Sequence, residues 1–132
     1  MAKKSIKGTQ TEKLLVASYI AESTAYTRYM FYAQAAQKEQ YFPIQKIFEE
    51  TADNEMHHAK VFFKMLEGGQ VEVSGKYDAG VIGSTLENLK IAAEEEKSEG
   101  YEFYAEAAKV AEKEGFDDIA SHFRAIATVE MH

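Results

Sequence analysis

The sequence predicts an all-α protein, a four-helix bundle with a long crossover between its second and third helices. Three observations lead to this fold class. The chain of 132 residues contains one proline and eight glycines, while alanine, glutamate, lysine and leucine fill its periodic stretches, a balance that favours long helices. Helix-capping signals open these stretches, and a glycine-rich connection divides the chain into two halves. This length suits a single domain, residues 1–132.

The first helix is predicted over about residues 10 to 38. Thr9 followed by Glu12 forms a capping box, in which the two side chains satisfy backbone N–H groups at the start of a helix. Apolar and aromatic side chains then recur on one face, which also carries a glutamate. The residues of this face are Leu15, Tyr19, Glu22, Tyr26, Tyr29 and Ala33.

The second helix is predicted to start near Pro43, because proline suits the first turn, and to stop at Gly68 and Gly69. Residues 68–83 then contain five of the eight glycines and a short Val-Glu-Val alternation. We interpret this segment as a connection rather than a strand. Antiparallel neighbours need only a few connecting residues, whereas a link of this length can run along the whole bundle.

The third helix is predicted to open at a second capping box, formed by Ser84 and Glu87, and to stop at Gly115. Asp117 and Asp118 are well placed to begin the fourth helix, because acidic groups favour a helix N-terminus. The second helix is predicted to continue well past the positions that are equivalent to the last residues of the sequence. The fourth helix, in contrast, stops with the sequence. The sequence therefore predicts an incomplete fourth helix.

Composition excludes several classes of function. The chain has no cysteine, so a metal within it must be held by oxygen and imidazole ligands. Its net charge of −7 argues against nucleic acid as the main partner, because a phosphate backbone needs a basic footprint. No stretch is long and uncharged enough to span a bilayer, and the start has no apolar run, so we expect no membrane contact and a cytoplasmic protein.

An internal repeat gives the first indication of chemistry. Residues 44–57 and 119–132 keep Ile, Phe, Ala, Glu, Met and His in the same register, so Glu55 and Glu130 hold equivalent places. The first copy continues to His58, which completes Glu-x-x-His. Residues three apart share a face of a helix, so a carboxylate and an imidazole can reach one point there. Metal binding is the usual reason for this pattern.

The repeat extends to the other two helices. A shift of 74 or 75 positions places Glu22 on Glu96 and Tyr29 on Tyr104. Isolated buried carboxylates are costly, and two divalent cations remove that cost. Hard oxygen ligands with imidazole suit iron or manganese, and ferritin-like di-iron bundles use one Glu from each of two helices with Glu-x-x-His from the others. The candidate metal ligands are Glu22, Glu55, His58, Glu96, Glu99 and Glu130.

The neighbouring residues are interpreted as structural or solvent-facing, without a role in metal binding. A surface ion pair would be the ordinary reading of Glu55 and His58 if they stood alone. The acidic run around the third helix is interpreted as a solvent-facing set, and the remaining aromatic residues as core packing. The acidic set is Glu94, Glu95 and Glu102; the aromatic set is Tyr26, Phe31, Tyr32 and Phe103.

Five stretches of the chain resemble the rubrerythrin family, and together they extend over nearly its whole length. They are residues 5–13, 47–60, 63–69, 79–85 with 88–89, and 114–120. The resemblance implies a non-haem di-iron peroxidase that reduces hydrogen peroxide while its iron cycles between ferrous and ferric states. It further implies that Glu22 chelates one iron and Glu96 the other, while Glu55 and Glu130 bridge the two.

The resemblance also implies a ligand exchange at the first iron. Glu99 would bind it in the ferric state and His58 in the ferrous state. Tyr29 and Tyr104 match tyrosines beside the carboxylates, where a phenol can orient a ligand or supply a proton.

Two departures from the family pattern stand out. The family usually carries a C-terminal rubredoxin domain with paired cysteines, so here the electrons are expected from an external protein of the rubredoxin type. The second iron usually takes a histidine at the position equivalent to 133. His132 is two residues from Glu130, about 200° around the helix, and is a poor substitute.

Two other classes of function remain open on the sequence. One is a ferroxidase or iron-handling protein, in which oxygen rather than peroxide is the oxidant. The other is a structural bundle without metal. An incomplete fourth helix would expose apolar faces of its neighbours, so a homodimer is expected, with helices exchanged between chains as one form of it.

Overall fold

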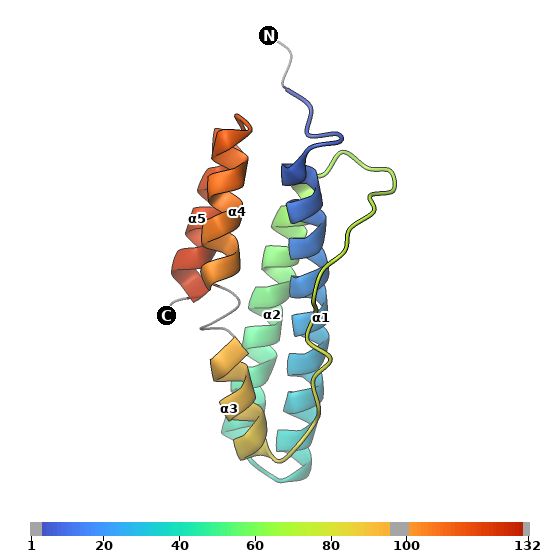
Figure 1. Ribbon diagram of the computed structural model, residues 1–132. Coiled ribbons are helices and arrows are strands. Elements are labelled where there is room, and N and C mark those ends of the chain that lie inside the picture. Colours follow the sequence, from blue (N-terminus) through green and yellow to red (C-terminus); the bar gives the residue numbers. More distant parts are fainter. Residues whose placement is uncertain (1–3, 96–100, 131–132) are drawn as a thin grey trace.

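The computed structural model describes residues 4–95 and 101–130, with side chains of the last helix described up to Thr128. Helices and connecting segments make up this part of the chain, which contains no strand, as Figure 1 shows. None of its helices is long and apolar enough to cross a bilayer. The helices are α1 (Gln10–Lys38), α2 (Phe42–Met65), α3 (Thr85–Glu95), α4 (Tyr101–Lys113) and α5 (Asp117–Glu130). The predicted all-α class is confirmed.

The helix starts follow the predicted capping signals. The Thr9 side chain accepts a hydrogen bond from the backbone N–H of Glu12 at 3.1 Å, and Glu12 in turn accepts from Gly8 at 3.1 Å, one residue earlier than in a standard box. Ser84 and Glu87 form the reciprocal pair, at 3.2 Å and 3.3 Å. The first turn of each half is therefore fixed locally.

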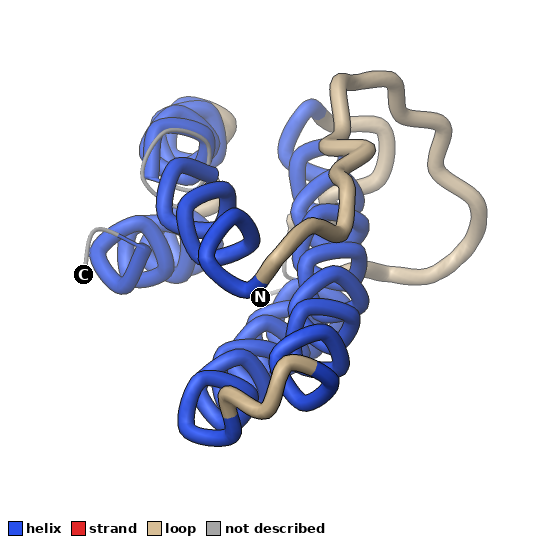
Figure 2. The backbone as a smooth tube through the Cα atoms, turned by 90° about the horizontal axis from the view of Figure 1, so that it is seen from below, coloured by secondary structure: helices blue, strands red, loops and turns tan. Residues whose placement is uncertain are grey.

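The crossover, residues 66–84, runs beside α1 from the end of α2 to the start of α3 (Figure 1). Seen from below, it lies outside the helices (Figure 2). It has no regular secondary structure, which confirms its interpretation as a connection. The predicted third helix is described as α3 and α4, and residues 96–100 between them lie outside the described part of the chain.

Two apolar clusters form the core. In the first, Phe62 of α2 stacks on Tyr104 of α4 and packs against Phe123 of α5, each pair of ring centroids being 5.5 Å apart. In the second, Tyr29 of α1 packs on Phe48 of α2 with centroids 6.2 Å apart, and α3 contributes a buried alanine. The two clusters occupy different levels along α1 and α2, and a layer between them is polar.

Some predicted core residues are in fact exposed. Phe31 is 43% exposed and Phe103 is 38% exposed, so their interpretation as core packing was wrong. Ile47, which continues the apolar spacing of α2, is 55% exposed. Helical periodicity identifies a broad apolar stripe, and residues at its edges are covered only where a neighbouring helix reaches them.

The repeat seen in the sequence recurs in the turns. Gln40 and Gly115 each follow a helix of one half with positive φ, 67° and 89° respectively. The next residues, Tyr41 and Phe116, donate backbone hydrogen bonds of 2.8 Å to alanines five residues earlier. These are Schellman-type helix ends, in which a left-handed residue lets the chain satisfy the last carbonyl groups.

The two halves also cap each other. The carboxylate of Glu114, after α4, accepts hydrogen bonds from the backbone of Thr11 at the start of α1. The carboxylate of Glu39, after α1, accepts from the backbone of Thr85 at the start of α3 at 2.8 Å and from its hydroxyl at 2.7 Å. Each half therefore has a glutamate after one of its helices that caps the start of a helix in the other half. This reciprocal capping makes the fold pseudo-symmetric.

Candidate metal centre

A polar layer separates the two apolar clusters at mid-height of α1 and α2. Glu22 lies on α1 between residues of the first and second clusters, and Glu55 lies at the matching level of α2. Both carboxylates are buried, at 2% and 5% exposure. The pattern of apolar residues on each helix therefore carries a glutamate into the interior, as the sequence predicted for both.

Glu22, Glu55 and His58 come together at one point. One ligand atom from each lies within 4.8 Å of the other two. Nδ1 of His58 lies 3.7 Å from Oε1 of Glu22, and the imidazole side chain is 18% exposed. The Glu-x-x-His spacing of α2 thus places the carboxylate and the imidazole on the face that meets Glu22, so the structure brings these three of the predicted ligands together.

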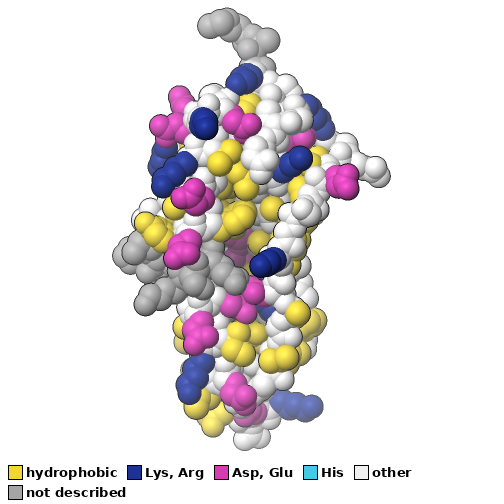
Figure 3. All heavy atoms as spheres, viewed as in Figure 1, with side chains coloured by type: hydrophobic (Ala, Val, Ile, Leu, Met, Phe, Trp, Pro, Cys, Tyr) yellow, Lys and Arg dark blue, Asp and Glu magenta, His cyan; other side chains and the backbone are white. Residues whose placement is uncertain are grey.

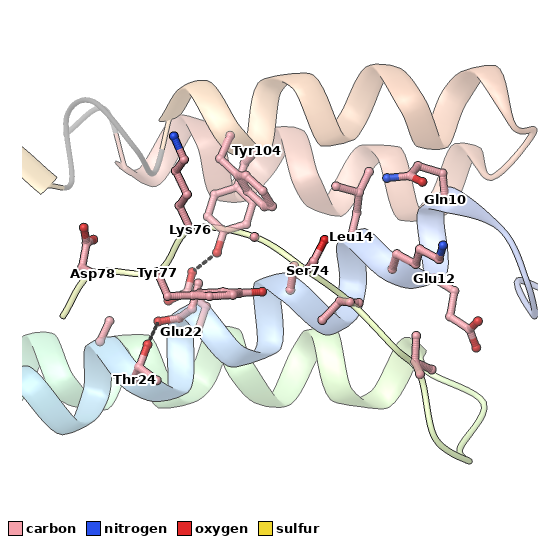
Figure 4. A pocket seen from close by; sticks show the side chains of 18 of the residues that line it. Gln10, Glu12, Leu14, Glu22, Thr24, Ser74, Lys76, Tyr77, Asp78 and Tyr104 are labelled. Atoms are coloured by element: carbon pink, nitrogen blue, oxygen red, sulfur yellow. Dashed lines mark hydrogen bonds between the residues drawn. The ribbon is translucent and has the colours of Figure 1, made fainter.

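Tyr104 ties α4 to this cluster. Its hydroxyl donates a hydrogen bond of 2.6 Å to Oε1 of Glu22, as the dashed line in Figure 4 marks. Stacking on Phe62 holds the ring, and Phe103 packs edge-on against it with centroids 5.3 Å apart. Tyr104 therefore fixes which way the Glu22 carboxylate is turned. Tyr29 is also buried, at 5% exposure, and lines the same cavity as Glu22.

The donor set fits a metal ion. Two carboxylates and an imidazole are brought into the interior, where an uncompensated charge is costly. A divalent cation offsets that cost, and carboxylate oxygen with imidazole nitrogen is a donor set suited to iron or manganese. Glu22 on α1 with Glu55 and His58 on α2 makes up one half of the pattern used by di-iron carboxylate bundles.

The other predicted ligands cannot be placed in the same way. Glu96 and Glu99 lie outside the described residues, which resume at Tyr101. Glu130 is the last residue of α5, and its side chain is not described. The assignment of these three residues to the second half of a metal centre stays a prediction.

The structure corrects the prediction for Glu95. Its carboxylate lies 3.3 Å from the guanidinium of Arg28 on α1, and both side chains are less than one-fifth exposed, so Glu95 does not belong to a solvent-facing set. Burial, together with the Glu95 carboxylate, raises the pKa of the nearby Tyr32 phenol. The pairing of Glu95 with a residue of another helix could not be predicted from one sequence. The position of Glu95 beside Glu96 was nevertheless a signal that it could face inward.

A cavity opens beside the cluster, bounded by α1, by the start of α4 and by residues 70–78 of the crossover. Figure 3 shows hydrophobic side chains in a hollow between α4 and the crossover, and Figure 4 shows the same region from close by. Glu22, Glu55 and Tyr104 are among its lining residues. Nothing in the sequence indicated that the crossover would form a wall of this site.

The fold and the site together define a ferritin-like helical protein with a buried carboxylate and imidazole cluster suited to metal. Comparison with known proteins narrows this class. Residues 13–132 match the family model described as Rubrerythrin. The chain therefore belongs to the rubrerythrin family.

Curated relatives agree. The chain is 50% identical over 127 residues to a rubrerythrin of Porphyromonas gingivalis, an alignment that covers 96% of this chain and 64% of the relative. It is 46% identical over 131 residues to rubrerythrin-1 of Clostridium acetobutylicum, covering 96% and 67%. Against a rubrerythrin of Nitratidesulfovibrio vulgaris the identity is 42% over 127 residues, covering 96% and 66%. The chain thus spans about two thirds of the length of these relatives.

Proposed function

We propose that this chain is a non-haem di-iron peroxidase that reduces hydrogen peroxide to water, acts in the cytoplasm and serves oxidative-stress defence. The observation that carries the proposal is the cluster of Glu22, Glu55 and His58, whose ligand atoms lie within 4.8 Å of one another in a chain of the rubrerythrin family. Each peroxide takes up two electrons and two protons and yields two water molecules. The electrons come from an external donor of the rubredoxin type.

Each residue of the cluster has a role in this proposal. Glu22, Glu55 and His58 hold iron, which when bound supplies one-electron transfer between its ferrous and ferric states. The Tyr104 hydroxyl, 2.6 Å from Oε1 of Glu22, fixes the orientation of that carboxylate. The same phenol can supply a proton to an oxygen beside Glu22, because it lies within hydrogen-bonding reach of that position.

The proposal extends to the residues whose side chains are not described. Glu96 would hold the second iron, and Glu130 with Glu55 would hold both ions. Glu99 would take the place of His58 as a holder of the first iron in its ferric state. The internal repeat supports the assignment of Glu96 and Glu130, because it places them at positions equivalent to Glu22 and Glu55, whereas the position equivalent to Glu99 is Ala25.

The oxidant decides between the proposal and its alternative. Protein loaded with ferrous iron without oxygen is mixed with peroxide or with oxygenated buffer, and the oxidation of the iron is followed by its absorbance. The proposal expects faster oxidation by peroxide. Faster oxidation by oxygen favours a ferroxidase or iron-handling protein. Glu55→Gln removes a ligand without changing volume, and Glu50→Gln, an exposed position on the same helix, is its control.

We also propose that the chain forms a homodimer, with exchange of helices as one form of it. The second apolar cluster is built from α1, α2 and α3, and exposed apolar side chains lie on these helices. They include Phe42 at 57%, Ile47 at 55% and Leu86 at 62% exposure. Covering such side chains is a common reason for association. Sedimentation equilibrium tests this, and a strict monomer at all concentrations contradicts it.

A further inference from the structure

The cavity beside the metal centre is large. Its volume is about 1270 Å³, above the roughly 300–1,000 Å³ of most small-molecule sites. It extends along α1 from Gln10 past Glu22 to Tyr29, beneath the crossover (Figure 4). Overall size therefore does not separate small from bulky ligands, and any selection must come from a side chain next to Glu22.

Tyr77 is the aromatic residue among the crossover residues that line the cavity. In the view of Figure 4 its ring crosses in front of Glu22, and the hydroxyl of Tyr104 on α4 donates to the same Glu22 carboxylate. All three residues line the cavity. The ring packs back on its own chain, since a methyl group at Gly75 would lie 3.6 Å from a ring carbon of Tyr77. Tyr77 is 42% exposed, and its side chain takes up part of the cavity that Glu22 also lines.

We propose that the Tyr77 ring is a size filter, which admits hydrogen peroxide to the space beside Glu22 and excludes bulky organic hydroperoxides. This inference rests on the proposed peroxidase function and names its substrate range. A ring that fills space beside a reacting centre discriminates by steric exclusion, and one added or removed group of this kind changes discrimination by about tenfold or more.

Because of the position of the ring, the proposed size filter can be tested without loss of the fold. Among the described residues, the hydrogen bonds that hold the crossover lie at its ends. Ser5 donates to Glu67 at 2.7 Å, and at the other end Tyr32 donates to the Val81 carbonyl at 3.4 Å. Truncation of Tyr77 removes neither bond. Three variants separate bulk from other effects: Tyr77→Ala removes the ring, Tyr77→Phe removes only the hydroxyl, and Val81→Ala changes an exposed side chain of the same segment.

The first readout is ligand binding and does not depend on turnover. Each protein is loaded with Co²⁺, and its visible bands are titrated with acetate and with benzoate, two carboxylates that differ in bulk. We expect Tyr77→Ala to bind benzoate at least about tenfold more tightly than the unchanged protein, with acetate binding altered less than about twofold. Tyr77→Phe and Val81→Ala should match the unchanged protein.

The second readout is the oxidation of the ferrous protein by cumene hydroperoxide relative to hydrogen peroxide, and only Tyr77→Ala should raise this ratio. An unchanged benzoate-to-acetate ratio in Tyr77→Ala overturns the size filter, as does a Tyr77→Phe that behaves like Tyr77→Ala. Altered carboxylate selectivity without peroxide oxidation leaves the filter standing and overturns the peroxidase proposal. A protein that takes up no Co²⁺ overturns both.

Discussion

The carboxylate of Glu114 holds the start of α1 against the end of α4, and its removal has a calculable cost. It accepts hydrogen bonds from the backbone N–H groups of Thr11, at 2.7 Å, and Gln10, at 3.2 Å, and also from the Thr11 hydroxyl. Both N–H groups belong to the first turn, where a helix offers them no acceptor of its own. Thr11 is 0% exposed, so water cannot take the place of the carboxylate there.

Glu114→Ala leaves these donors without an acceptor. A buried donor left unsatisfied costs about 1–3 kcal/mol, and loss of a helix cap about 0.5–2 kcal/mol. Since Gln10 is exposed and regains water, we expect the free energy of unfolding to fall by about 2–3 kcal/mol. The control is Glu106→Ala, which removes an exposed ion pair with Lys109 and should cost less than about 1 kcal/mol. Urea unfolding followed by circular dichroism measures both.

The pH dependence of the free energy of unfolding provides a second test of this prediction. Burial alone would raise the pKa of the Glu114 carboxyl, but hydrogen bonds from Thr11 and Gln10 hold it below its usual value. A pKa lowered by folding adds stability above the ordinary glutamate pKa, and this stability is lost as the pH falls through the folded-state value. The gap between the unchanged protein and Glu114→Ala should therefore shrink in acid. A gap below about 0.5 kcal/mol at neutral pH, or one that stays constant in acid, would contradict this role of Glu114.

Three further predictions concern the site and the core. Tyr104→Phe removes the hydrogen bond to Glu22 and should weaken iron binding by about 10–100-fold, as competition with a chelator would measure. Phe62→Ala opens a cavity at a side chain that is 0% exposed and should cost about 3–5 kcal/mol in urea unfolding; a loss below about 1 kcal/mol contradicts this packing. Glu39→Ala uncaps Thr85 and should cost about 1–2 kcal/mol, less than Glu114→Ala because Glu39 is exposed.

Local signals in the sequence predict the helices well. The starts of α1 and α3 follow from capping residues at Thr9 and Ser84, and the end of α4 from Gly115. Repeat and periodicity also place Glu22 and Glu55 inside the bundle. These features depend on residues within one helix or on a comparison of two helices, which a single sequence contains.

Long-range neighbours were not predictable in the same way. Glu95 is half-buried because Arg28 approaches it from α1, and nothing in the spacing of α3 indicates that pairing. Phe103 stays 38% exposed although its ring packs edge-on against the neighbouring Tyr104. The role of Tyr77 as a wall of the cavity depends on the path of an irregular segment, which has no periodicity to interpret.

The central claim is that Glu22, Glu55 and His58 form one half of a di-iron centre. Anomalous diffraction at the iron absorption edge from iron-loaded crystals tests it most directly. Two peaks per bundle are expected, one of them within bonding distance of Glu22, Glu55 and, in the ferrous protein, His58. Iron bound elsewhere on the surface, or no peak at these three side chains in protein that contains iron, would contradict it.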